Sequence, residues 1–129
     1  MACNVDSPLG IYDMVGEQAI PQGADWDVAI IYLENDAPVN FSTGFEARMQ
    51  IRLDYDKNII LELSTEDGTI QLGSGIGNTP NVILKFLNGV TTNMSQYTGI
   101  YDIEVVATST GLVKKFLKGK FELDREVTK

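Results

Sequence analysis

The sequence predicts an all-β protein, an antiparallel β-sandwich of the Ig-like or jelly-roll-like type with about seven strands. Three observations support this prediction. Short apolar segments recur along the chain, turn residues separate them at hairpin spacing, and no segment has the period of a long helix. A parallel α/β fold would need crossover helices, and no segment is suited to form one. We expect an extended N-terminal arm at residues 1–24, followed by a β-sandwich domain at residues 25–129.

The predicted arm contains Pro8, Pro21 and three glycines, which break regular elements. Its apolar content is nevertheless too high for a purely solvated tail. We therefore expect an arm with little structure of its own that binds a partner, and the alternative is a frayed terminus packed partly on its own domain. The candidate partner-binding residues are Leu9, Ile11, Tyr12, Met14, Val15 and Ile20.

The first strand is predicted at residues 26–34, WDVAIIYLE, which are rich in β-branched and aromatic residues. A strictly alternating stretch follows at residues 45–53. Its apolar face consists of Phe45, Ala47, Met49, Ile51 and Leu53, and its polar face of Glu46, Arg48, Gln50 and Arg52. One buried and one solvated face are typical of antiparallel sheets. The turn at residues 54–58 leads into a return strand at 59–65, so a hairpin is expected here.

Four more strands are expected, at residues 69–73, 82–87, 100–108 and 112–123. A loop separates the first two, and the polar segment 88–99 has room for one helical turn. In the strand at 100–108 we expect one face to be formed by Tyr101, Ile103, Val105 and Ala107. In the last strand we expect an inward face formed by Val113, Leu117, Phe121 and Leu123.

The composition leaves few options for catalysis, because the chain has no histidine and its single cysteine is Cys3. Cys–His and Ser–His mechanisms are thereby excluded, and a zinc site would need carboxylates alone. A lone cysteine also cannot form an internal disulfide, which permits a reducing compartment. We predict no catalytic, cofactor-binding or metal-binding residues, no cofactor and no enzymatic activity.

Two short motifs suggest ligands but depart from the required patterns. GSGIG at residues 73–77 resembles a phosphate loop, yet Asn78 stands in place of the third glycine and no helix is expected to follow. DYDKN at residues 54–58 resembles the start of a calcium loop, yet Ile59 replaces the glycine and Thr65 the final glutamate. We expect both segments to be ordinary loops.

The formal net charge is −8 and the isoelectric point is about 4.3. Such acidity disfavours non-specific nucleic-acid binding and adhesion to anionic membranes. We expect the N-terminal residues not to be a secretory signal, and no apolar run is long enough to cross a bilayer. We therefore expect a soluble protein made in the cytoplasm, with neither nucleic acid nor membrane as a partner.

A single basic cluster stands out in the last strand and consists of Lys114, Lys115, Lys118 and Lys120. Lysines on an edge strand deter aggregation between sheets, and this is the favoured interpretation. The alternative is that these lysines border an interface with an acidic partner.

Four stretches resemble, in their order along the chain, a class of small β-domain proteins. They are IPQGADWDVAIIYLENDAPVNFSTGFEARMQIR at 20–52, LELSTEDGTIQLG at 61–73, GIYDIEVV at 99–106 and LVKKFLKGKFELDREVTK at 112–129. The class comprises structural proteins of tailed bacteriophages and prophages and is similar to the N-terminal domain of phage baseplate upper proteins. The resemblance covers about residues 20–129, and residues 1–19 and 73–98 depart from its pattern.

The resemblance implies a virion protein made in the cytoplasm of a host bacterium. It implies an adaptor or attachment component of the tail, neck, fibre base or baseplate, which forms a homo-oligomer and binds other phage virion proteins. A head-decorating cement protein is the close alternative, and copy number would separate the two.

A carbohydrate-binding β-sandwich is a further alternative, which would require an exposed aromatic platform. The aromatic residues available are Trp26, Tyr32, Tyr55, Tyr97 and Tyr101. Most of them stand at inward or turn positions, so we expect core packing instead.

Overall fold

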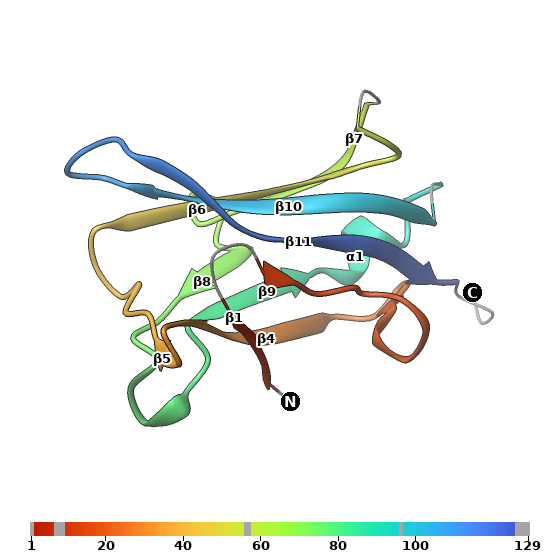
Figure 1. Ribbon diagram of the computed structural model, residues 1–129. Coiled ribbons are helices and arrows are strands. Elements are labelled where there is room, and N and C mark those ends of the chain that lie inside the picture. The colour runs from red at the N-terminus through yellow and green to blue at the C-terminus, as the bar shows by residue number, and fades with distance from the viewer. Residues whose placement is uncertain (1, 7–9, 56–57, 96, 126–129) are drawn as a thin grey trace.

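The computed structural model describes residues 2–6, 10–55, 58–95 and 97–125. These residues form two β-sheets packed face to face, which confirms the all-β sandwich (Figure 1). The five-stranded sheet has the order β1-β4-β9-β8, with β5 paired to β4. Its strands are β1 (Ala2–Asp6), β4 (Trp26–Glu34), β5 (Ala37–Pro38), β8 (Ile70–Leu72) and β9 (Val82–Phe86).

The six-stranded sheet has the order β2-β11-β10-β6-β7, with β3 also paired to β11. Its strands are β2 (Gly10–Ile11), β3 (Ile20–Pro21), β6 (Phe45–Arg52), β7 (Ile59–Ser64), β10 (Thr98–Ala107) and β11 (Val113–Asp124). One α-helical turn, α1 (Asn88–Thr91), lies in the polar segment where room for a helical turn was predicted. Two short 3-10 segments occupy Gly16–Gln18 and Ile76–Asn78.

The prediction of about seven strands is too low, because the described residues contain eleven strands, β1 to β11. The seven predicted strands correspond to β4, β6, β7, β8, β9, β10 and β11. The sheets are also not purely antiparallel, since β1 pairs with β4, and β2 and β3 with β11, in parallel. These N-terminal strands are short and lack an alternating pattern, so no local periodicity marks them.

The N-terminal residues connect the two sheets at one side of the sandwich. β1 lies at the edge of the five-stranded sheet, and β2 and β3 lie along β11 at the edge of the six-stranded sheet (Figure 1). The chain therefore joins both edges before it enters β4, and short edges of this kind resist unwanted pairing.

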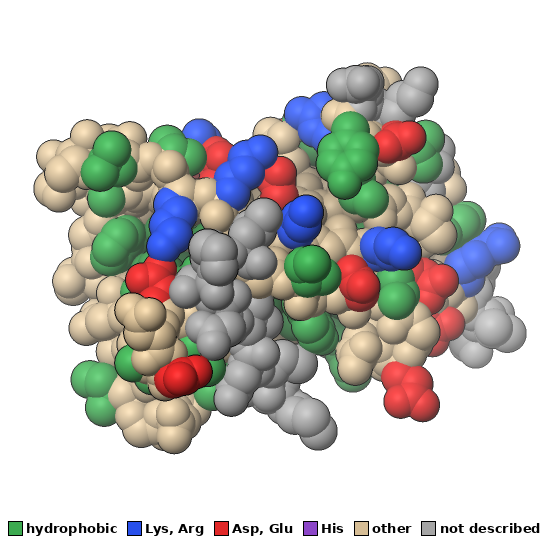
Figure 2. Space-filling model, viewed as in Figure 1, with side chains coloured by type: hydrophobic (Ala, Val, Ile, Leu, Met, Phe, Trp, Pro, Cys, Tyr) green, Lys and Arg blue, Asp and Glu red, His purple; other side chains and the backbone are tan. Residues whose placement is uncertain are grey.

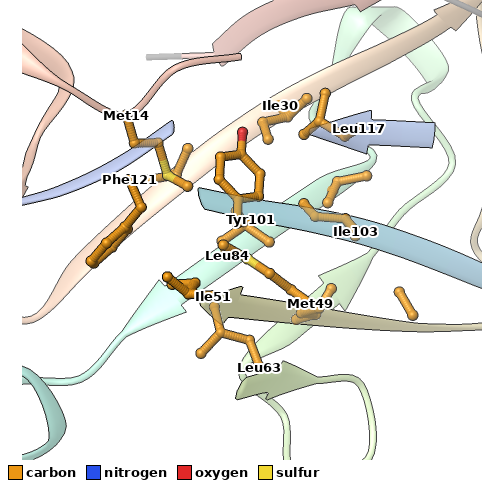
Figure 3. Close-up of a cluster of buried hydrophobic side chains, with 14 of the residues drawn as sticks. Met14, Ile30, Met49, Ile51, Leu63, Leu84, Tyr101, Ile103, Leu117 and Phe121 are labelled. Carbon is orange, nitrogen blue, oxygen red and sulfur yellow. The ribbon is translucent and has the colours of Figure 1, made fainter. Parts of the chain in front are cut away.

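The alternation predicted for β6 is confirmed, because Ala47, Met49 and Ile51 are buried between the sheets. Leu53 lies beyond the end of the strand and is exposed. Met49 and Ile51 belong to one hydrophobic core cluster, which also contains Leu84 from the opposite sheet (Figure 3). Burial of each such side chain contributes about 1.5–3 kcal/mol, so this cluster stabilises the sandwich.

A β-bulge in β11 changes the face predicted for the last strand. Ile103 pairs with Leu117 and Glu104 with Lys115, so Phe116 is the extra residue. Phe116 and Leu117 are both buried, whereas Val113, predicted to point inward, is exposed. A bulge places two residues opposite one, and it therefore reverses the alternation on its far side.

Candidate functional site

The six residues predicted to bind a partner are distributed between the surface and the core. Leu9 lies outside the described residues, Ile11 is 66% exposed, and Tyr12 and Val15 are half-buried. Met14 and Ile20 are fully buried in the hydrophobic core. Figure 3 places Met14 beside Phe121 of β11. The surface of this chain thus presents Ile11, while Met14 and Ile20 stabilise its own fold.

Backbone hydrogen bonds to β11 hold this N-terminal segment in place. The amides of Tyr12 and Met14 donate to the carbonyl oxygens of Lys118 and Lys120, at 2.9 and 2.8 Å. The amide of Glu122 donates to the Met14 carbonyl at 2.9 Å. The edge of β11 is thereby covered from Leu117 to Asp124. The interpretation of the lysines as protection of an open edge is therefore wrong over this part of the strand.

Gly119 allows the segment to approach β11 closely. A methyl group at this position would lie 2.0 Å from the Tyr12 carbonyl oxygen. The same carbonyl accepts a hydrogen bond from the Tyr101 hydroxyl of β10. Only glycine leaves room for this arrangement, which ties the N-terminal segment to two strands at once.

Polar side chains cover the outer face of the six-stranded sheet and form an open groove. We call this surface the charged face. Its basic residues are Arg48, Arg52, Lys115, Lys118 and Lys120, and its acidic residues are Asp13, Glu62, Asp102 and Glu104. In the view of Figure 2, basic side chains lie over the part of the molecule formed by β6, β10 and β11 in Figure 1.

The register of the strands arranges these charges in rows. Glu104 of β10 stands between Arg48 of β6 and Lys115 of β11. Asp102 likewise stands opposite Lys118 in the register, and it accepts a hydrogen bond from Lys115 at 3.1 Å. Arg48 pairs directly with Glu104. Opposite charges on neighbouring strands stabilise a sheet modestly, so these acids are compensated within the face.

The third row differs, because an apolar residue occupies its centre. Ile100 of β10 stands between Arg52 of β6 and Lys120 of β11. Tyr55, in the turn after β6, lines the same groove and is 78% exposed. This end of the charged face therefore contains an arginine and a tyrosine, two residue types enriched in protein interfaces, beside an isoleucine and a lysine.

Two ionisable groups outside the charged face have shifted pKa values. The pKa of Asp67 is lowered, mainly because Thr69 donates hydrogen bonds to its carboxylate from its hydroxyl and its amide. The pKa of Lys114 is raised, mainly by its hydrogen bond to Glu34 of the opposite sheet. Both groups secure the scaffold, since one closes a turn and the other joins the two sheets.

Two aromatic side chains, Trp26 and Tyr55, are exposed and depart from the expectation of core packing. Tyr32 and Tyr101 are buried as expected, but Trp26 is 45% exposed at the start of β4. Tyr97 lies under the guanidinium of Arg125, 4.3 Å from the ring centre. Trp26 stands on the five-stranded sheet and Tyr55 on a turn of the other sheet, so they do not belong to one sheet surface.

The described residues of the two ligand-like motifs lie outside the strands. The GSGIG segment contains a short 3-10 turn and leads into β9. In the DYDKN segment, Asp56 lies outside the described residues. Among the described residues, no group of three or more acidic or cysteine side chains is placed to hold a metal ion.

No family model matches the sequence, and no curated protein matches it either. In the described part of the chain, no helix has the length and apolarity needed to cross a membrane.

The charged face as a whole was not predicted from the sequence, although Lys115, Lys118 and Lys120 belong to the predicted basic cluster, whose alternative interpretation was an interface with an acidic partner. The other charged residues of the face come from separate segments of the sequence. Only the neighbour order β11-β10-β6 brings them together.

Proposed function

We propose that this chain is a non-enzymatic structural protein of a tailed-bacteriophage virion, an adaptor or attachment component of the tail, neck, fibre base or baseplate. The observation that carries the proposal is the ordered resemblance of four stretches, at 20–52, 61–73, 99–106 and 112–129. The two-sheet sandwich supports it, because a rigid scaffold suits repeated contacts between subunits. The Ig-like or jelly-roll-like form of this sandwich is part of the same proposal.

In this role the chain assembles with itself and with neighbouring virion proteins, after synthesis in the host bacterial cytoplasm. Among the described members of the predicted set, the exposed Ile11 and the half-buried Tyr12 and Val15 remain accessible for such contacts. The charged face supports the proposal as well, since it contains arginine and tyrosine side chains, which are enriched where proteins bind one another.

Mass spectrometry of purified particles tests the proposal. The particles are those of the phage whose genome encodes the chain, separated by density from host proteins. We expect the chain in the particles at a fixed ratio to the other virion proteins, and labelled antibody at the tail, neck, fibre base or baseplate in electron micrographs. Particles that are complete and infectious without the chain would refute the proposal.

The same experiment distinguishes a tail or baseplate component from a head-decorating cement protein. A cement protein would occur in far more copies per particle, and the antibody would label the capsid.

The carbohydrate-binding alternative has one observation in its favour, the exposed Trp26. Trp26 is the single tryptophan of the chain, so its fluorescence reports on sugar binding directly. No change of fluorescence on titration with host-surface oligosaccharides would count against this alternative.

A further inference from the structure

The charged face differs in charge from the rest of the chain. Among the described residues, its lining contains five basic and four acidic side chains, whereas the whole chain has ten basic and eighteen acidic residues. The formal charge of this described lining is therefore +1, in a chain whose net charge is −8. A surface that concentrates the basic residues of an acidic protein is complementary to the remaining surface of the same protein.

The end of the charged face near the β6–β7 turn combines an arginine and a tyrosine with an apolar residue. Arg52 and Lys120 stand on either side of Ile100, and Tyr55 projects beside them. Tyrosine and arginine are enriched among the residues that contribute most to binding. Ile11, at the opposite edge of the groove, adds a second exposed apolar side chain.

We propose that the charged face binds the acidic surface of a second copy of this chain, with Tyr55, Arg52 and Lys118 among its main contacts. Because the two surfaces differ, the contact is heterologous, and repetition of it produces rings or open chains of subunits. The inference rests on the proposed assembly role and specifies the surface that mediates it. It does not depend on the location of the chain in a particle.

Sedimentation of the purified full chain over a range of concentrations measures this contact. We expect oligomers at about 0.15 M salt, where screening confines the repulsion between the acidic chains to about 8 Å. We expect dissociation toward monomers at about 1 M salt, where the screening length falls to about 3 Å. A chain that stays monomeric at all concentrations would overturn this proposal. It would not decide whether the chain is a virion protein, which mass spectrometry of purified particles tests separately.

Two matched pairs of variants locate the contact. Lys118→Glu and Lys85→Glu change the net charge equally, and each places a glutamate opposite an aspartate in the strand register, Asp102 or Asp27. We expect Lys118→Glu to weaken association about tenfold or more, which corresponds to about 1.4 kcal/mol, and Lys85→Glu to leave it near wild type. Equal effects of the two would show that only net charge matters and would refute the assignment of the face.

Tyr55→Ala and Ile76→Ala form the second pair, since both side chains are more than 70% exposed. We expect only Tyr55→Ala to weaken association. Circular dichroism checks that each variant is folded.

Carbodiimide cross-linking of a mixture of isotope-labelled and unlabelled chains then identifies the acidic residues that contact Lys118 or Lys120 of another copy. Cross-links found solely within one chain would contradict the contact between copies.

Discussion

The β6–β7 hairpin and the N-terminal segment at residues 10–24 lie at opposite sides of the six-stranded sheet, and they are built in different ways. The hairpin has a regular alternation of buried and solvated residues and pairs with itself. The N-terminal segment has buried residues at irregular spacing, Met14, Ala19 and Ile20, and its short strands pair with β11. The structure of the hairpin is therefore specified by its own residues, whereas the N-terminal segment adopts its structure only by pairing with β11.

The largest effect is expected in the hairpin, where Met49→Asp would place an unpaired charge in the core. Met49 is fully buried, and an uncompensated buried charge costs several kcal/mol. We expect the variant to be unfolded by circular dichroism at room temperature. Gln50→Asp, on the outer face of the same strand, is the control and should remain folded. A folded Met49→Asp chain would mean that the inward face of β6 is wrongly assigned.

The next effect concerns the N-terminal segment, through Met14→Ala. Removal of this fully buried side chain leaves a cavity, so we expect the free energy of unfolding to fall by about 2–5 kcal/mol. The matched control is Ile11→Ala, three residues earlier, which is exposed and should change stability by less than about 0.5 kcal/mol. Urea denaturation measures both. Equal stability of the two variants would show that the segment is not part of the core in solution.

Gly119→Ala tests the difference between the hairpin and the N-terminal segment from the side of β11. It disturbs the packing of the segment on β11 without changing the sequence of the segment. The added methyl group meets the Tyr12 carbonyl oxygen and must displace it, which we expect to cost about 1–3 kcal/mol. Hydrogen exchange should accelerate at the amides of Tyr12 and Met14 and stay slow in β6. Gly89→Ala is the control, since nothing lies within 4 Å of its added methyl group. Unchanged exchange at Tyr12 would contradict the close approach.

The smallest effect is expected at Asp67, in the turn that follows β7. Its pKa is below the ordinary value of 3.8, so its ionised form stabilises the fold above that pH. This stabilisation is lost as the pH falls through the lowered pKa. Asp67→Asn should therefore flatten the fall of stability with pH below about pH 4, as measured by urea denaturation at several pH values. Glu66→Gln is the control, and an identical effect of both variants would argue against a specific role of Thr69.

Much of the scaffold could be predicted because its signals are local. The faces of β6 and β10 follow directly from alternation, as the buried Met49 and Ile103 show. The bulge at Phe116 could not be predicted, since it depends on the pairing of β11 with β10. The candidate site was predicted in the N-terminal segment, yet two of its residues are buried, and only the lysines of β11 in the charged face were considered as an interface.

The sequence by itself determined seven strands, their solvated and buried faces over most of their length, and the acidic net charge. These properties follow from the two-residue period of a strand and from composition, and both can be read without knowledge of neighbours. Only the tertiary structure decided that residues 10–24 lie along β11, that β1 joins the other sheet, and that the basic residues of β6 and β11 share one face on either side of β10. The physical reason is that the packing of the whole chain decides which strands become neighbours. No local sequence pattern specifies which segment pairs with an edge strand.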